Sequence, residues 1–199
     1  SSSALQMQKD KIMTDLKEEQ ERSEVHRAIW EIANELRGAV DGWDFKNYVL
    51  VTMFYRYISE NLSNYIDEGE TDGNNSNFRY ADMSDEEAEE ARNDLVEEKG
   101  FFILPSELFC NVLKNAPGNP NLNETLEKVF RHIEESAKGT ASERSFAGLF
   151  DDFDVNSNKL GTTVAKRNET LTKLLNGIAD MDLGDVKHHD IDAFGDAYD

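Results

Sequence analysis

The sequence predicts an all-α fold, a compact helical domain of five to seven helices joined by long polar loops. Three observations support this prediction. Apolar residues recur along most of the chain at spacings of three and four, the period of one helix face. Clusters of Gly, Pro, Asn and Asp separate these stripes. No stretch alternates apolar and polar residues for long enough to build a sheet, and no internal repeat is present.

The first predicted helix follows a polar start. Residues 1–12 lack periodicity, and we expect them to be an expression remnant or a disordered arm. The helical pattern begins at Thr14, and Gly38 is its stop signal. Its apolar face consists of Val25, Ile29, Ile32 and Leu36.

A second helix is predicted after the turn residues 41–46, with Asp44 as a candidate N-cap. Trp43 and Phe45 are assigned, with Asp44, to packing and capping between the first two helices. The apolar stripe of the second helix is the broadest in the chain, so we expect this helix to be the most buried. The stripe comprises Val49, Leu50, Met53, Phe54, Tyr57, Ile58 and Leu62.

The middle of the chain predicts a loop and then an acidic helix. Residues 69–83 are rich in Gly, Asn and Asp, which is typical of a loop. Ser84 and Glu87 fit the capping-box pattern. They open one solvated helix over residues 85–99, which Gly100 ends.

A short helix and a turn follow. Residues 101–104 are predicted to be extended, because Pro105 disfavours the helical conformation in the residue before it. Ser106 is the candidate cap of a short helix that reaches Leu113. Residues 115–121 concentrate Asn, Pro and Gly and predict a turn.

Two longer helices are predicted beyond this turn, and a further one begins in the acidic tail. The first ends near Gly139, and the second follows the polar stretch 151–161. Their apolar stripes are Leu122, Leu126, Val129, Phe130 and Ile133 in the first, Val164, Leu171, Leu174, Leu175 and Ile178 in the second, and Ile191, Phe194 and Tyr198 in the tail.

Charge and cysteine content narrow the class of protein. The chain has 41 acidic and 21 basic side chains and a formal net charge of -20, which argues against autonomous DNA binding. Its one cysteine, Cys110, cannot form an internal disulfide, and no secretory signal is present. The longest nearly apolar run, residues 48–58, is far shorter than the roughly 20 residues of a membrane span. We expect a cytoplasmic protein with no membrane contact.

Motifs for catalysis or cofactor binding are missing from the sequence. It contains no glycine-rich nucleotide or S-adenosylmethionine turn, no phosphate-binding lysine loop, no Gly-x-Ser-x-Gly elbow and no Cys-x-x-Cys pair. We therefore predict no catalytic, cofactor-binding or metal-binding residue in this chain.

Residues 152–158 imitate the start of an EF-hand calcium loop, because oxygen-bearing side chains stand at alternate positions. The pattern fails where a Gly and a bidentate Glu are expected, since Ser157 and Thr163 occupy those positions. We favour a hydrogen-bonded loop that caps the following helix.

Other candidate sites have simpler interpretations. His188, His189 and Asp190 are read as surface residues, since adjacent side chains diverge. Cys110 is read as a small buried apolar residue. Four Asn-x-Ser/Thr sequons are regarded as compositional accidents, and an aromatic set is assigned to packing and not to base stacking. The sequons lie at Asn61, Asn74, Asn123 and Asn168, and the aromatic set is Trp30, Trp43, Phe45, Tyr48, Phe54, Tyr55 and Tyr57.

One basic group stands out in the C-terminal half. Lys166 and Lys173 are seven residues apart, and Lys159 precedes them by the same spacing. A solvated helix face is the simpler interpretation, yet this is the local stripe that could meet phosphates. The candidate DNA-facing residues are Lys159, Lys166, Arg167 and Lys173.

Several stretches, taken in order, resemble the N-terminal domain of the modification subunit (HsdM), the DNA methyltransferase of type I restriction-modification systems. No single stretch is diagnostic, but their order is, and the resemblance covers about residues 14–199. They are residues 26–30 (HRAIW), 33–38 (ANELRG), 41–50 (DGWDFKNYVL), 54–62 (FYRYISENL), 100–105 (GFFILP), 146–150 (FAGLF), 154–161 (DVNSNKLG) and 192–198 (DAFGDAY).

The resemblance implies that residues 13–183 form a helical N-terminal domain and that residues 184–199 begin the connection to an S-adenosylmethionine-binding domain missing here. In the family that next domain methylates adenine N6 through an Asn-Pro-Pro-aromatic motif. The nearest string here, residues 118–121, lacks the second Pro and the aromatic. The implied partners are the specificity subunit, the restriction subunit and target DNA, and the chain itself would hold no cofactor.

Two hypotheses from other classes remain open on the sequence. An acidic DNA-mimicking inhibitor fits the net charge, although its carboxylates should cover one continuous surface and these cluster at residues 85–98 and 180–199. A stand-alone calcium sensor is weakened at Ser157 and Thr163.

Overall fold

The computed structural model describes residues 6, 7, 9, 27 and 44–181. The predicted helix over residues 14–38 lies outside this part of the chain except for Arg27. Trp43, His188, His189, Asp190 and the predicted helix in the tail also lie outside the described residues.

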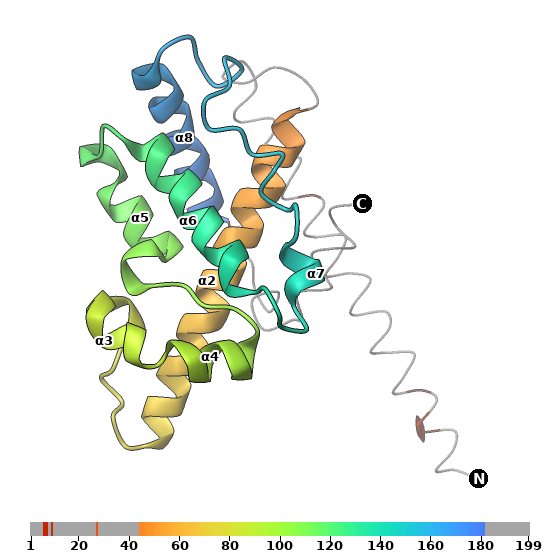
Figure 1. Cartoon of the computed structure of the whole chain (residues 1–199), viewed down its shortest axis with the longest axis vertical. Coiled ribbons are helices and arrows are strands. Elements are labelled where there is room, and N and C mark those ends of the chain that lie inside the picture. The colour runs from red at the N-terminus through yellow and green to blue at the C-terminus, as the bar shows by residue number, and fades with distance from the viewer. Residues whose placement is uncertain (1–5, 8, 10–26, 28–43, 182–199) are drawn as a thin grey trace.

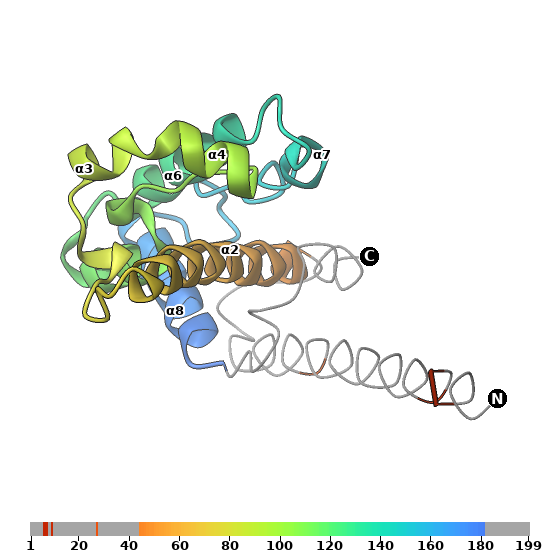
Figure 2. The ribbon, with the colours of Figure 1, turned by 90° about the horizontal axis from the view of Figure 1, so that it is seen from below.

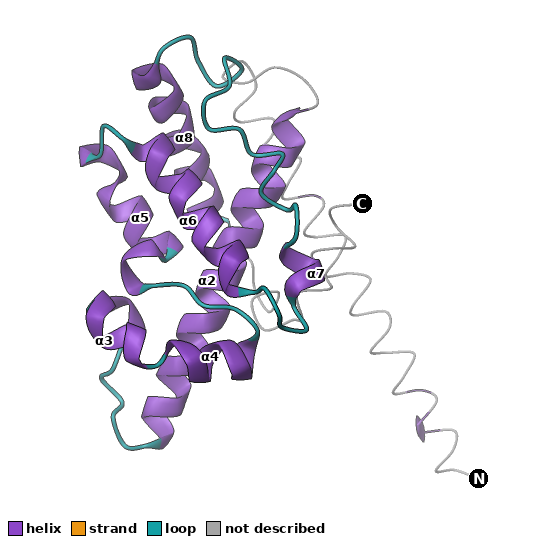
Figure 3. Ribbon diagram, viewed as in Figure 1, coloured by secondary structure: helices purple, strands orange, loops and turns teal. Residues whose placement is uncertain are grey.

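Residues 44–181 contain seven α-helices, three short 3-10 helices and no strand, so the all-α prediction is confirmed (Figure 3). The α-helices are α2 (Asp44–Asp72), α3 (Asp85–Glu90), α4 (Arg92–Lys99), α5 (Phe109–Asn115), α6 (Leu122–Ser136), α7 (Glu143–Phe146) and α8 (Val164–Ala179). The 3-10 helices are η1 (Tyr80–Asp82), η2 (Pro105–Glu107) and η3 (Ala116–Gly118). No described helix is long and apolar enough to cross a membrane.

Helix α2 is the axis around which the other helices pack (Figure 1). Figure 2 shows α3, α4, α6 and α7 on one side of α2, while α8 crosses it. Every residue from 48 to 55 is buried, as expected for the helix with the broadest apolar stripe. The structure corrects both boundaries, because Asp44 is already helical and the helix continues to Asp72, beyond the predicted start of the loop.

The aromatic residues of this core pack on each other, which confirms the packing interpretation for Tyr48, Phe54, Tyr55 and Tyr57, all of them buried. Phe130 of α6 stacks on Phe150, with ring centroids 4.4 Å apart and an interplanar angle of 6°. Tyr55 and Phe153 meet Phe130 edge-on, at 5.3 and 5.1 Å. Phe130 therefore joins α2, α6 and the chain beyond α7.

The acidic segment begins and ends as predicted but is divided in two. Ser84 Oγ accepts a hydrogen bond from Glu87 N at 3.2 Å, and Gly100 ends α4 in the left-handed conformation with φ of 86°. A turn at Ala91 separates α3 from α4, so the prediction of one helix is wrong. Only Ala88 and Leu95 of these two helices are buried, and charged residues on both sides of the break give no sequence signal for it.

Ser106 does not cap α5, which corrects another prediction. Its backbone N and Oγ bind the Asp85 carboxylate at 3.0 and 2.6 Å, and α5 starts at Phe109. The backbone N–H of Phe109, the first residue of α5, has no partner within the helix and donates instead to Ser59 Oγ of α2 at 3.1 Å. The cap comes from a residue 50 positions away in the chain, which local sequence cannot reveal.

The helices α6 and α8 carry the predicted apolar stripes with one exception. Val164, assigned to the buried stripe of α8, is 46% exposed. It is the first residue of the helix, where the chain arrives from an exposed loop, and the helical spacing alone does not reveal this.

Candidate nucleic-acid interface

The loop before α8 is folded tightly onto the first turn of that helix. Thr163 caps α8 by accepting a hydrogen bond from Lys166 N at 3.1 Å, so the prediction that the loop caps the helix is confirmed. Gly161 has a φ of 159°, and a Cβ there would lie 2.7 Å from Lys166 Cβ and 2.9 Å from Arg167 N. Only glycine fits this approach without displacing the helix.

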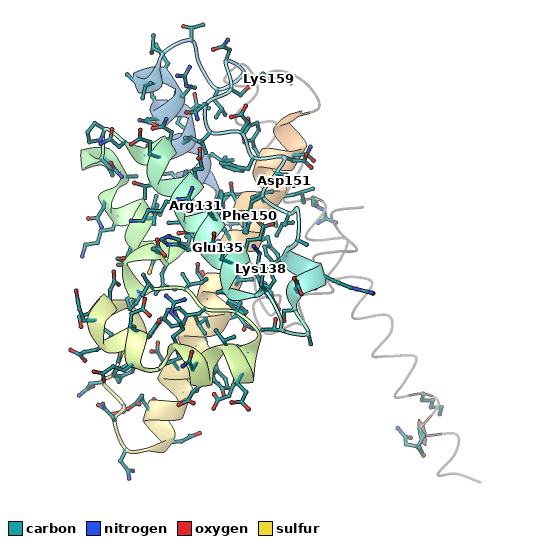
Figure 4. The ribbon with its side chains drawn as sticks, viewed as in Figure 1. Arg131, Glu135, Lys138, Phe150, Asp151 and Lys159 are labelled. Atoms are coloured by element: carbon teal, nitrogen blue, oxygen red, sulfur yellow. The ribbon has the colours of Figure 1, made fainter. Side chains whose placement is uncertain are left out.

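Three of the four candidate DNA-facing residues lie on the surface of this loop and helix. Lys159, Lys166 and Lys173 are exposed. Thr170 lies between Lys166 and Lys173 on the same face of α8 and donates from Oγ1 to Leu160 O at 2.7 Å. This bond holds the backbone of Leu160, the residue after Lys159, against the helix face that carries Lys166 and Lys173. Figure 4 labels Lys159 on this loop. Lys173 also forms an exposed ion pair with Glu169 at 3.7 Å.

Arg167 is oriented differently from the three lysines. It is half-buried, and its Nη1 donates to Gly161 O at 3.2 Å. Its Nε is buried without a hydrogen-bond partner. The guanidinium thus supports the loop from within, which leaves the lysines as the accessible positive charges of the group.

Three asparagines anchor the loop to the core, and sequence reasoning missed them. Asn123 and Asn168 are only 5% and 9% exposed. Asn123 N donates to Asn168 Oδ1 at 3.0 Å, and Asn168 Nδ2 donates to Pro120 O at 2.8 Å. Asn123 Nδ2 reaches the loop at Asn156 Oδ1, at 2.9 Å. Buried amides need such partners, so this network fixes the loop relative to α6 and α8.

The oxygen-rich residues 152–158 use several of their polar groups within the protein. Asp154 Oδ1 accepts from Asn156 N at 2.9 Å, and Ser157 Oγ accepts from Lys159 N at 3.2 Å. Tyr48 OH donates to Asp154 O at 2.7 Å. This is the hydrogen-bonded loop that the sequence favoured. In the described part of the chain, no three His, Cys, Asp or Glu side chains are grouped so that they could hold a metal ion.

Cys110 is exposed on α5, so the prediction that it is buried is wrong. The residue lies on the outer side of this short helix, between the buried Phe109 and the half-buried Asn111. Partial desolvation raises the pKa of its thiol, and the nearby carboxylates of Glu60 and Asp82 act in the same direction. The raised pKa disfavours the reactive thiolate.

The rest of the described surface is mainly acidic. Residues 85–98 carry eight carboxylates and one arginine, whereas residues 159–173, which include all three lysines, carry four basic residues and one carboxylate, that of Glu169. The lysines of the loop and α8 therefore form a local positive surface, which we call the α8 basic surface and define as Lys159, Lys166 and Lys173. The surface belongs to an all-helical acidic domain.

Comparison with known proteins assigns the chain to a family. The profile of the HsdM N-terminal domain matches residues 25–178, which is most of the chain. The chain therefore belongs to the HsdM N-terminal domain family. Membership does not favour the DNA-mimicking inhibitor or the calcium sensor.

The relatives that this chain resembles are larger proteins. It is 47% identical over 189 residues to the type I restriction enzyme MpnII methylase subunit of Mycoplasma pneumoniae, covering 92% of this chain and 35% of that protein. It also resembles the crystal structure of a type I restriction-modification system methyltransferase subunit from Streptococcus thermophilus, with a TM-score of 0.67 and 28% identity. That match covers 89% of this chain and 37% of the other. The chain thus spans about a third of each relative.

Proposed function

We propose that this chain is the helical N-terminal domain of a type I restriction-modification methylase subunit, without a catalytic site of its own. The observation that carries the proposal is the family match, together with 47% identity to a methylase subunit of which the chain covers 35%. The domain would help the subunit to assemble with its specificity subunit and to close around target DNA. The restriction subunit would join the same complex.

S-adenosylmethionine binding and adenine-N6 methylation would belong to the remainder of such a subunit. Neither a glycine-rich turn nor an Asn-Pro-Pro-aromatic string occurs in this sequence. Calorimetry of the isolated chain with S-adenosylmethionine should therefore show no heat beyond dilution. A saturable micromolar response would place the cofactor site in this domain and contradict the proposal.

The charge distribution supports two separate contacts. The acidic surface suits a basic region of a partner subunit, since complementary charges guide association. The α8 basic surface suits the DNA backbone, and the anchored loop and the helix fix the backbone positions of its lysines before binding. With a net charge of -20, the isolated chain should bind duplex DNA only weakly at physiological salt.

The DNA contact is tested in the assembled complex of full methylase and specificity subunits. The DNA affinity is measured against salt concentration for the unsubstituted complex and for Lys159→Ala/Lys166→Ala/Lys173→Ala. Each lost phosphate contact should lower the magnitude of the salt slope by roughly one unit and weaken binding about equally for all target sequences. Arg167 stays in place, because its removal would disturb the loop as well as the charge.

A matched control removes three positive charges elsewhere. Lys128 and Arg131 are exposed on α6, and the exposed Lys138 follows the end of that helix. Figure 4 labels Arg131 and Lys138 apart from Lys159. The triple alanine variant at these positions changes the net charge equally and should keep the salt slope. Equal slopes for both variants would exclude the α8 basic surface from the DNA contact and leave the domain as a protein-docking element.

A further inference from the structure

The C-terminal end of α8 is held by an arginine from α2. Arg56 Nη1 donates to two backbone carbonyls, Ile178 O at 2.5 Å and Met181 O at 2.7 Å. The Arg56 side chain is only 13% exposed. One side chain thus connects the axial helix of the domain to the end of its last described helix, 122 and 125 positions further along the chain.

The sequence of α8 offers neither a left-handed glycine nor a basic residue at the C-terminal end of the helix. The last carbonyls of a helix lack intrahelical partners, and a left-handed glycine or a nearby cation usually satisfies them. The last turn of α8 contains no basic residue, and its C-cap, Asp180, is right-handed with φ of −78° and ψ of −12°. Asp180 N donates to Asn176 O at 3.1 Å, and Met181 N donates to Ile178 O at 3.2 Å. The Arg56 guanidinium adds a second donor to Ile178 O, a donor to Met181 O beyond the helix, and a positive charge at the negative end of the helix dipole.

Glu60 holds the guanidinium in the orientation that reaches these carbonyls. Arg56 Nε donates to Glu60 Oε1 at 2.8 Å, one turn further along α2. The fork of Arg56 therefore binds a carboxylate through one nitrogen and two carbonyls through another. A lysine would keep the charge but has a single nitrogen, so it cannot occupy both positions at once.

We propose that Arg56 is a positioning residue that fixes the C-terminal end of α8, up to Met181, against α2. The family match ends at residue 178, so the carbonyls that Arg56 binds lie at the C-terminal boundary of the family's domain. Arg56 thus fixes the end of the matched region against the core of the domain. The inference requires neither DNA nor a partner subunit and goes beyond the proposed function.

The test is a distance measurement by electron spin resonance on the whole chain. Cys110 is the single cysteine of the sequence and is exposed, so it accepts a spin label without substitution. A second label is placed at Asp180→Cys, an exposed position whose capping contacts are made by its backbone. The distance distribution between the labels is compared with and without Arg56→Lys.

We expect a narrow distribution for the unsubstituted Arg56 and loss of that narrow peak in Arg56→Lys. A matched pair, Cys110 with Lys173→Cys, reports the exposed middle of α8 and should stay narrow in both proteins. Glu60→Gln retains an acceptor for Arg56 Nε and should broaden the 110–180 distribution less than Arg56→Lys does.

Two results would overturn the proposal. If the 110–180 distribution is the same with arginine and with lysine, Arg56 does not position the helix end. If both label pairs broaden together, Arg56 stabilises the domain in general and has no specific effect on the end of α8. Since the measurement involves no DNA and no second subunit, either failure leaves the proposed function untouched.

Discussion

Helices α3 and α4 are strongly acidic, whereas residues 150–179, the loop with α8, carry four carboxylates and four basic residues. The two regions also differ in the way they are attached to the core. Helices α3 and α4 bury Ala88 and Leu95 and otherwise present mostly charged side chains to solvent. The loop before α8 buries Phe150, Phe153, Val155 and Leu160 and is fixed by buried asparagines as well. The first region is attached by few side chains, and the second is attached by many.

This difference indicates that the net charge of the chain is a poor guide to what one surface of the domain can bind. Exposed charges are screened beyond a Debye length of about 8 Å at physiological ionic strength. A phosphate at the α8 basic surface would therefore respond mainly to the lysines beside it, although the whole chain carries a charge of -20. How firmly the loop and α8 are attached to the core then determines whether those lysines have defined positions relative to one another.

The largest expected effect is the loss of Phe130, the residue that joins the loop region to α2. Phe130→Ala should lower the free energy of unfolding by about 3 to 5 kcal/mol, because it removes a large buried ring and leaves a cavity. Urea unfolding followed by circular dichroism measures this. Tyr65→Ala is the counterpart beside α4, where the ring is 41% exposed, and should cost clearly less. Equal losses would mean that the two regions are attached equally well.

The asparagine network should give the next largest effect. Asn168→Ala leaves the buried Asn123 amide and the Pro120 carbonyl without partners and should cost about 1 to 3 kcal/mol. Asn176→Ala changes an exposed asparagine of the same helix and should stay within about 0.5 kcal/mol of the unsubstituted chain. If both substitutions cost the same, the network does not anchor the loop.

The sequence predicted the helical class and several boundaries because these depend on local signals. Ser84, Gly100 and the stripe of α6 follow from capping chemistry and spacing. The break at Ala91 was missed because the residues on both sides of it are charged and exposed. The cap of α5 was missed because its donor and acceptor are 50 residues apart in the chain.

The candidate surface was predicted only in part, because its geometry also depends on contacts between residues far apart in the chain. Seven-residue spacing correctly grouped Lys166 with Lys173, since it places both on one helix face. It could not show that Arg167 turns toward Gly161, because adjacent positions on a helix face different surroundings. Asn123 and Asn168 were regarded only as sequon positions. Both are buried, and they are hydrogen-bonded to each other across 45 positions of the chain.

A smaller effect is expected at the start of the acidic region. Ser84→Ala removes the side-chain acceptor for Glu87 N and should lower the free energy of unfolding by about 1 kcal/mol. Hydrogen exchange of the α3 amides should accelerate, while amides of α8 keep their protection. Ser145→Ala, at an exposed serine of α7, serves as the control. Faster exchange in α8 as well would show that the acidic helices and the loop region open together.

The smallest effect is expected for the ion pair between α3 and α4. Arg92 binds Glu89 through two nitrogens, at 2.7 and 2.6 Å, and this hydrogen bonding lowers the pKa of the Glu89 carboxyl. Both side chains are more than a third exposed, so Glu89→Gln should cost only about 0.2 to 1 kcal/mol at pH 7. The Arg92 guanidinium also lies 4.4 Å from the centre of the Phe102 ring, a contact that the substitution leaves in place.

The pH dependence of this small difference has a definite sign. A carboxyl whose pKa is lowered by folding stabilises the protein above its ordinary pKa, and the stabilisation is lost as the pH falls through the lowered value. The gap in unfolding free energy between the unsubstituted chain and Glu89→Gln should therefore be largest near pH 7 and should close as the pH falls below the ordinary pKa of a glutamate and through the lowered one. Denaturant midpoints at several pH values and at low and high salt measure it. A gap that widens on acidification would show that the Glu89 charge does not stabilise the acidic helices.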